Sequence, residues 1–234
     1  MIGDLSHLGN CPQNIMSLSS VIIIVISYLL GSIPFGYIFS KTSGKEILKI
    51  GWRKTSGSNV FRNIGAWQGL ATGICDVGKG FLAVYLAQNL GFSQLIQVLS
   101  GVAAVTGHNW SCFIKMAGGR GIGTLIGALA AFSIKILGFS LIPFILLALI
   151  WNASIGTILF LVALIYFSIY FGQFETIGVL TSISLLPIFI KRLSPISELS
   201  LEKKEVIRNR LIFDDDIPRF DLRIKRIIKR LTKR

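Results

Sequence analysis

The chain has 234 residues, of which 52% are hydrophobic and 15% are charged, and its mean hydropathy is +0.68. A soluble domain carries about 25% charged residues, so this composition argues against a water-soluble enzyme with a single buried core. The formal net charge of +13 would suit a nucleic-acid partner, but 22 of the 24 Lys and Arg residues lie in three stretches, 41–62, 115–120 and 191–234. Because long apolar segments separate these stretches, we expect a membrane protein that does not bind nucleic acid.

Apolar segments follow one another along most of the chain and predict membrane-spanning helices, each of which needs about 20 predominantly apolar residues. The clearest segment, Ser20 to Ser40, has 21 residues without a charge, and Ile136 to Phe174 is a run of 39 uncharged residues, long enough for two crossings. Trp151 and Asn152 form the natural break near the middle of that run. We therefore predict an all-α polytopic membrane protein with seven transmembrane helices, near 20–41, 67–90, 95–114, 121–138, 139–151, 154–172 and 175–190.

The positions of the basic residues test this count, because Lys and Arg are retained on the cytoplasmic side of a membrane. With seven spans, the loops after the first, third and fifth spans lie on the same side as the C-terminal tail, and together they hold 22 Lys and Arg residues. Six or eight spans would place the basic first loop and the basic tail on opposite sides. We therefore predict an external N-terminal segment (1–19), a membrane domain (20–190) and a basic cytoplasmic tail (191–234).

The C-terminal tail divides into two parts. Residues 198–216 have mixed charge and are expected to be solvated. Residues 220–231 would form a helix with basic residues around one apolar face, which consists of Phe220, Ile224, Ile227, Ile228 and Leu231. Such a helix can lie on an anionic bilayer surface, and a disordered basic tail that only follows the charge rule fits the sequence equally well. Neither interpretation gives the tail a chemical role.

Ionisable residues within the predicted spans are candidate functional residues, because a charge in a membrane is unfavourable unless it is paired or hydrated. Asp76 and Lys79 are three residues apart on one helical face and can pair with each other. They would either form a buried ion pair that holds helices together or line a polar cavity open to the cytoplasm. His108 follows Gly107 at the cytoplasmic end of the third span, where an interface role and a catalytic role both fit. No pair among Asp76, Lys79 and His108 has the spacing of a base and its orienting partner, so we expect these residues to organise a pocket.

The glycine-rich segment 107–124 leads into the fourth predicted span. Glycines before a helix allow backbone N–H groups to approach an anion, the helix N-terminus adds its positive dipole, and Arg120 supplies a bidentate phosphate donor. Alternatively, Gly119, Gly123 and Gly127 form a ladder of small residues that packs helices closely, and Arg120 only anchors the cytoplasmic side. Both interpretations can apply to one segment.

The first predicted cytoplasmic loop offers a similar set of groups. The small polar side chains of Ser56, Ser58 and Asn59, together with Arg62, can bind a phosphate oxyanion at the membrane surface. These are also ordinary loop residues, so the signal is weak by itself. The chain has no H-E-x-x-H, G-x-S-x-G or H-x4-D motif and no Walker loop, so hydrolase, soluble-type acyltransferase and nucleotide-driven functions have no motif to support them.

Several segments resemble those of the acyl-phosphate:glycerol-3-phosphate acyltransferase family of bacteria, the PlsY family. The resemblance covers residues 20 to 190 and is carried by Gly31-Ser32-Ile33-Pro34-Phe35-Gly36, Ser58-Asn59-Val60-Phe61-Arg62-Asn63-Ile64-Gly65, Asp76-Val77-Gly78-Lys79-Gly80, the segment Gly107 to Gly121, and Ser154-Ile155-Gly156-Thr157.

The chain also departs from the family pattern. The first family motif normally begins Gly-Ser-Gly-Asn, whereas this chain has Gly51-Trp52-Arg53-Lys54. Arg120 stands where a lysine is usual and Trp151 where a basic residue is common. Arg192 and Pro195 are the equivalents of a His and an Asn that the family usually shows after its last span. The cationic replacements can still hold a phosphate, but the departures also fit a changed substrate or a lost activity.

The resemblance implies transfer of a fatty acyl group from acyl phosphate to the 1-hydroxyl of glycerol 3-phosphate, giving lysophosphatidate and inorganic phosphate. The implied partners are glycerol 3-phosphate, fatty acyl phosphate and the lipid bilayer, and the implied location is the cytoplasmic face of the bacterial plasma membrane. No cofactor or metal is expected, because acyl phosphate is already activated and positioning two anions can supply much of the rate effect. We assign substrate and phosphate binding to Ser56, Ser58, Asn59, Arg62, Lys79, Lys115, Gly118, Gly119, Arg120, Gly121 and Ser154, and pocket organisation to Asp76 and His108.

Two other functions are compatible with the sequence. A small anion transporter would fit seven short, glycine-rich spans, but its polar residues should continue through the bilayer midplane, and here nearly all of them lie at one face. A catalytically silent relative that acts as a membrane partner would explain the departures from the first and last family motifs.

Overall fold

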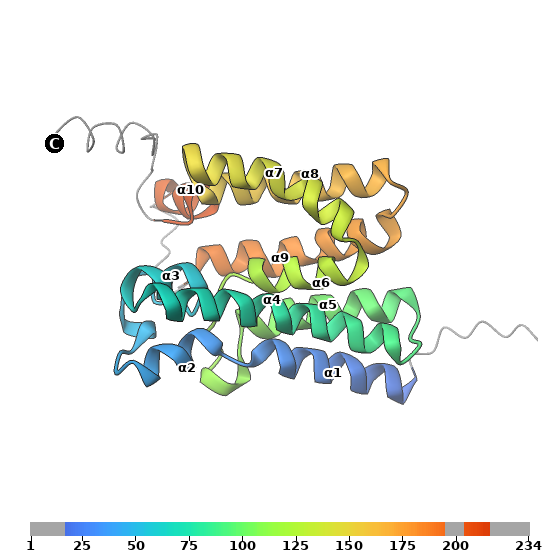
Figure 1. Ribbon diagram of the computed structural model, residues 1–234, viewed down its shortest axis with the longest axis horizontal. Helices are drawn as coiled ribbons and strands as arrows, with labels where there is room; N and C mark the ends of the chain where they lie inside the picture. The colour runs from blue at the N-terminus through green and yellow to red at the C-terminus, as the bar shows by residue number, and fades with distance from the viewer. Residues whose placement is uncertain (1–16, 195–203, 216–234) are drawn as a thin grey trace, which may run out of the picture.

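The computed structural model describes residues 17–194 and 204–215, and within these ranges every regular element is helical, as the sequence predicted (Figure 1). Most of the predicted external segment, Pro195 and the segment 220–231 lie outside the described residues. The α-helices are α1 (Leu18–Ser32), α2 (Phe35–Thr42), α3 (Gly57–Asn63), α4 (Ala66–Asn89), α5 (Gln94–Asn109), α6 (Ile122–Phe132), α7 (Ile134–Ile150), α8 (Ala153–Tyr170), α9 (Val179–Leu193) and α10 (Lys204–Phe213). Short 3-10 turns lie at Ile47–Lys49 and Cys112–Ile114, and a π-helical turn at Phe174–Gly178 leads into α9.

The long helices run side by side along one axis of the molecule, and α3 and α10 lie at the same end of it (Figure 1). α4 packs against α6, α1 against α5, and α7 against α8. Four segments, Leu18–Thr42, Ala66–Asn89, Ala153–Tyr170 and Phe174–Leu193, are long and apolar enough to cross a membrane, and Ile122–Phe132 and Ile134–Ile150 are shorter apolar helices. The count of seven spans and the orientation of the termini stay predictions.

Three helix boundaries differ from the expected spans. The first span is interrupted at Pro34, which has no N–H to continue the hydrogen bonds of α1, and the chain resumes as α2. The helix of the third predicted span, α5, ends at Asn109 and not near residue 114. Residues 110–120, which include the 3-10 turn Cys112–Ile114, connect it to α6. The break expected between residues 138 and 139 lies instead at Ser133, whose hydroxyl accepts a hydrogen bond from Ile136 N–H (3.3 Å) and begins α7. That expectation was wrong because it divided an apolar run by length and overlooked the serine cap.

α4 and α6 approach each other through glycine. A Cβ atom at Gly80 would collide with Thr124 O, and one at Gly127 would collide with Val77 O. In lipid there is no hydrophobic driving force that brings helices together, so close contact between backbones is a main source of helix association in a membrane. The packing interpretation of the small-residue ladder therefore applies at Gly127, and this contact sets the start of α6 beside α4.

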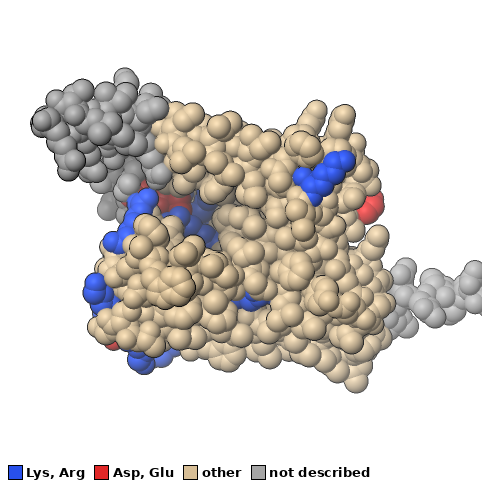
Figure 2. Space-filling view, in the orientation of Figure 1, with Lys and Arg blue, Asp and Glu red and all other residues tan. Residues whose placement is uncertain are grey.

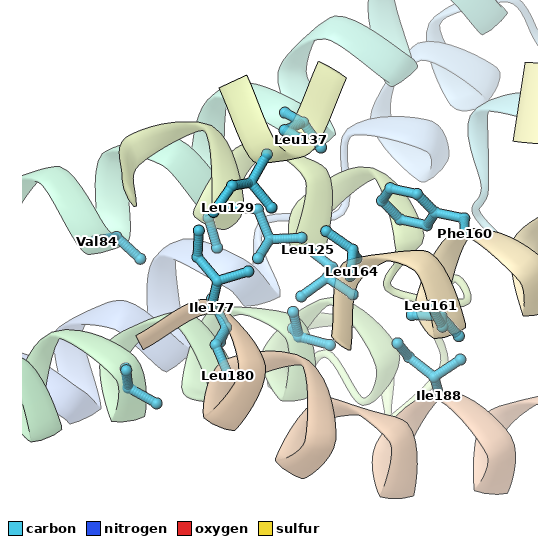
Figure 3. Close-up of a cluster of buried hydrophobic side chains, with 14 residues drawn as sticks. Val84, Leu125, Leu129, Leu137, Phe160, Leu161, Leu164, Ile177, Leu180 and Ile188 are labelled. Carbon is cyan, nitrogen blue, oxygen red and sulfur yellow. The ribbon is translucent and has the colours of Figure 1, made fainter. Parts of the chain in front are cut away.

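A cluster of buried apolar side chains joins α4, α5, α6, α7, α8 and α9 (Figure 3). Its members labelled in Figure 3 are Val84, Leu125, Leu129, Leu137, Phe160, Leu161, Leu164, Ile177, Leu180 and Ile188. Many other large apolar side chains are exposed on the helices, as expected for surfaces that face lipid.

The polar loops meet at one end of the bundle. Thr55 N–H donates to Gly118 O (3.3 Å), Lys54 Nζ donates to Lys191 O (3.3 Å), and Arg192 Nη2 donates to Ser154 O (3.2 Å). These bonds join the loops that contain Thr55 and Gly118 to the end of α9, and the end of α9 to the start of α8. Figure 2 shows Lys and Arg side chains gathered at this end, with charged atoms of both signs in a hollow, and a largely uncharged surface along the rest of the same face.

Candidate functional site

A cavity of about 760 Å³ lies at this polar end and is bordered by α3, α4, α6 and the start of α8. One part of its wall is polar and another part is apolar, the apolar part including Leu70, Ile74, Val77, Ile122 and Phe144. Of the residues assigned from the sequence, those that line the cavity are Ser56, Ser58, Arg62, Asp76, His108, Arg120 and Ser154. The site can therefore hold an anionic group and a hydrocarbon chain side by side.

Trp52 brings together two of the three arginines that line the cavity. The guanidinium carbons of Arg62 and Arg120 lie 4.6 and 4.7 Å from the centre of the Trp52 ring. Stacking on an aromatic face fixes a guanidinium group while its N–H donors stay directed outward in its plane, where they can bind an anion. The sequence identified Trp52 only as a departure from a family motif, and it missed this role because the contact joins two separate loops.

Asp76, Lys79 and His108 form one buried group between α4 and α5. Asp76 Oδ1 lies 3.0 Å from Lys79 Nζ and 3.3 Å from His108 Nδ1. Lys79 Nζ also donates to Ile33 O (3.0 Å), at the break between α1 and α2. Asp76 is thus half of a buried ion pair within α4 and also part of the cavity wall, while the links to neighbouring helices are made by Lys79 with Ile33 O and by Asp76 with His108.

The contacts of this group differ in two ways from what the sequence suggested. Lys79 does not line the cavity, and its ammonium group is bound to Asp76 and to a backbone carbonyl, so it is not placed to bind phosphate. Asp76 and His108 do form the pairing of a carboxylate with an imidazole that the spacing did not predict, because the packing of α4 on α5 brings together residues far apart in the chain.

Gly119 is held against His108. Its N–H donates to His108 O (3.1 Å), and a Cβ atom at this position would collide with His108 Nε2. The expectation that the backbone of Gly118 to Gly121 cradles a phosphate therefore fails at Gly119, whose N–H is already used. What the segment provides instead is a fixed backbone from which the next residue, Arg120, reaches the cavity.

Lys115, Gly118 and Gly121 also lie outside the wall of the large cavity. Lys115 is exposed and borders a separate cavity of about 250 Å³ together with Gly118. Gly121 is the N-cap of α6 and has a φ of 81°, a left-handed conformation that glycine adopts without strain. Their positions give no support to the phosphate-binding role assigned to them.

Asn59 organises the first loop. Its Nδ2 donates to Lys54 O (2.8 Å) and Ile50 O (3.3 Å). Its Oδ1 accepts from Trp52 N–H (3.1 Å) and Asn63 Nδ2 (2.9 Å). The side chain is fully buried, and these four bonds use both donors and both acceptor sites of the amide. These contacts give no support to the expected bond from Asn59 to a substrate, and Asn59 holds the loop that carries Trp52.

Lys54 and Arg192, two of the departures from the family pattern, are buried at the same end. Lys54 Nζ lies 3.4 Å from Asp214 Oδ1, and Arg192 donates to Ser154 O and to Leu211 O (2.6 Å). Burial lowers the pKa of the Lys54 ammonium group below its ordinary value, and the Asp214 carboxylate opposes part of this shift. Both cations are thus bound to acceptors of the protein itself.

The end of α10 reaches the same cavity, so the expectation of a solvated segment 198–216 does not hold for Arg210, Phe213 and Asp214. Asp214 lines the cavity with a side chain that is only 2% exposed, and its Oδ2 contacts Arg120 Nε. Arg210 and Phe213 of α10 are buried as well. The mixed charge of this segment could not reveal the contact, because its partners belong to loops far away in the sequence.

Comparisons with known proteins identify the family. The family described as "Glycerol-3-phosphate acyltransferase" matches residues 21–200. The glycerol-3-phosphate acyltransferase of Prochlorococcus marinus (strain MIT 9312) is 36% identical over 160 residues, covering 66% of this chain and 80% of the relative. Glycerol-3-phosphate acyltransferase 5 of Dehalococcoides mccartyi is 32% identical over 212 residues, covering 86% of this chain and 91% of the relative.

Two crystal structures of PlsY, an integral membrane glycerol 3-phosphate acyltransferase, have a similar fold. The glycerol 3-phosphate form has a TM-score of 0.69 and the lysophosphatidic acid form one of 0.67, each at 24% identity and covering 76% of this chain and 90% of the PlsY chain. The helical architecture, the apolar helices and the match over residues 21–200 agree, and we conclude that this chain is a membrane-embedded acyltransferase that belongs to the glycerol-3-phosphate acyltransferase family.

Proposed function

We propose that this chain transfers a fatty acyl group from acyl phosphate to the 1-hydroxyl of glycerol 3-phosphate, at the cytoplasmic face of a bacterial plasma membrane. The observation that carries the proposal is the divided wall of the 760 Å³ cavity, where Arg62 and Arg120 face the same space as an apolar surface. An acyl phosphate has the same division between an anionic head and a hydrocarbon chain. The basic end of the bundle suits two anionic substrates.

The reaction needs no covalent enzyme intermediate. The 1-hydroxyl oxygen attacks the carbonyl carbon of the acyl phosphate, an ester bond forms, and the bond between that carbon and the phosphate oxygen breaks. The hydroxyl proton goes to phosphate, and the products are lysophosphatidate and inorganic phosphate. Holding both substrates in line and neutralising their charge lowers the barrier without a nucleophilic side chain.

The side chains of the cavity divide this work. Arg62 and Arg120 bind phosphate oxygens, and the hydroxyl groups of Ser56, Ser58 and Ser154 supply further hydrogen bonds. Asp76 and His108, which also line the cavity, hold the backbone from which Arg120 projects, through the contact of His108 with Gly119.

The test is the choice of acyl donor. Purified full-length protein, with glycerol 3-phosphate and a chelator present, should form lysophosphatidate from acyl phosphate and release one inorganic phosphate for each product. Acyl-CoA and acylated acyl carrier protein should give far slower reactions under the same conditions. Equal or faster reaction with either thioester would show that the proposed donor is wrong, and an Arg62→Ala, Arg120→Ala double variant serves as the background control.

A further inference from the structure

A carboxylate occupies the cationic part of the cavity. Asp214 Oδ2 contacts Arg120 Nε, and Asp214 Oδ1 lies 3.4 Å from Lys54 Nζ. The side chain of Asp214 is 2% exposed and that of Arg120 18%, so solvent screens the contact only weakly. The anion at this arginine is therefore supplied by the protein itself.

The backbone at Asp214 has an uncommon conformation. Asp214 follows the last residue of α10 and has a φ of 54°, in the left-handed region. Glycine is the usual residue at this position of a helix end because it adopts that conformation without steric cost. An aspartate here accepts the strained backbone and gains the ion pair with Arg120.

Two reciprocal contacts hold α10 in place. Arg192 of α9 donates to Leu211 O (2.6 Å), and Arg210 of α10 donates to Leu193 O (3.1 Å). α10 begins at residue 204, beyond the last residue of the family match at 200. Lys54 and Arg192, in contrast, lie inside the matched region but depart from the family pattern. Lys54, Arg192 and α10 therefore form one connected structure.

We propose that Asp214 is an internal competitor for the phosphate site, which glycerol 3-phosphate displaces on binding, so that this residue sets the substrate affinity. The inference rests on the proposed phosphate-binding role of Arg120. It accounts for both the cationic replacements and the helix beyond the matched region, which are otherwise unrelated features of the chain.

The chemistry of the two anions makes the exchange favourable for substrate. A carboxylate offers one charge and two oxygens, whereas a phosphate monoester offers up to two charges and three terminal oxygens. With Asp214 in place, Arg120 Nη2 is buried and has no hydrogen-bond partner among the residues that the structure describes. A tetrahedral phosphate can reach donors that the planar carboxylate leaves unused.

The experiment compares Asp214→Asn and Asp214→Ala with wild type in the full-length protein. The neutral side chains remove the competitor, so the apparent KM for glycerol 3-phosphate should fall. The fall should be about tenfold if Asp214 is bound to Arg120 in about nine tenths of the wild-type molecules. Asp215→Asn is the matched control, because it removes the same charge from the next residue, which borders a cavity of about 200 Å³ but not the large one. It should change KM little.

Direct binding separates this inference from the proposed reaction. Calorimetric titration with inorganic phosphate and with glycerol 3-phosphate should show tighter binding to Asp214→Asn than to wild type or Asp215→Asn, whether or not acyl phosphate is the donor. An unchanged KM with a lower thermal stability would identify Asp214 as a structural anchor and overturn the inference. A raised KM would overturn it in favour of a positioning role for the carboxylate. Equal gains in affinity in Asp214→Asn and Asp215→Asn would show that the effect comes only from net charge, and this result would also overturn the inference.

Discussion

Arg120 combines a proposed binding role with structural contacts. Its guanidinium group stacks on Trp52, contacts Asp214 and borders the cavity, while its backbone continues from Gly119, which is packed against His108. The packing interpretation and the phosphate-binding interpretation of the glycine-rich segment thus apply to two neighbouring residues. Gly119 serves packing, and the side chain of Arg120 is the group available to an anion.

The Arg120→Ala variant tests that division. Loss of a charge-assisted contact should weaken the use of glycerol 3-phosphate by about 1.5–3 kcal/mol, roughly tenfold or more in apparent affinity, while the protein stays folded. The measurements are the KM for glycerol 3-phosphate and the thermal unfolding temperature in detergent. Unchanged affinity with lowered stability would make Arg120 a structural anchor and would place the phosphate site elsewhere.

The pair α4 and α6 is the element on which the site depends most. α4 carries Asp76 and lines the apolar wall, and α6 begins at Ile122, two residues after Arg120. Their separation is set by the backbone contacts at Gly80 and Gly127. A change of side chain at either glycine should therefore move the two walls of the cavity apart.

Gly127→Ala should lower the thermal unfolding temperature and the activity together. The added methyl group would collide with Val77 O, and overpacking of this kind costs about 1–3 kcal/mol. Gly78→Ala is the matched control, because it lies in α4 and a Cβ atom there meets nothing within 4 Å. The control should be as stable as wild type. Equal unfolding temperatures for the two variants would show that α4 and α6 are not closely packed.

At the scale of the whole molecule, charge and lipid-like surface separate along one axis. The chain segments around Lys54, Gly118, Ser154 and Lys191 are bonded to one another at the polar end of the bundle. Exposed apolar side chains cover the helices. Such a molecule has one face for water-soluble anions and a flank for hydrocarbon, which is the arrangement that joining a polar alcohol to a fatty acyl chain requires.

This arrangement predicts the membrane topology. A reporter fused after Arg234 should be cytoplasmic, and one placed before Ser20 should be external, because 22 Lys and Arg residues lie on the side of the first loop and the tail. The measurement is paired reporter activity, with alkaline phosphatase active outside and a fluorescent protein fluorescent inside. Both termini on one side of the membrane would contradict an odd number of spans.

Much of the helical framework was predictable because the length of an apolar run is a local property. The helix at Ala66–Asn89 and the one at Ala153–Tyr170 lie within one or two residues of the predicted spans. The break at Ser133 was missed, since one serine in an apolar run is a weak signal. Among the candidate site residues, Arg62, Arg120 and His108 do border one cavity, whereas Asn59 is used entirely by its own loop.

The sequence by itself determined that this protein is a helical membrane protein with its basic residues collected in a few loops, and that it resembles one acyltransferase family. These properties follow from composition and from motifs of adjacent residues. Only the tertiary structure decided which charges meet: Asp76 with His108, Trp52 with two arginines, and Asp214 with Lys54, which is 160 positions away in the chain. The physical reason is that an ion pair or a stacking contact depends on distances between side chains far apart in the chain, and the packing of helices and loops sets those distances.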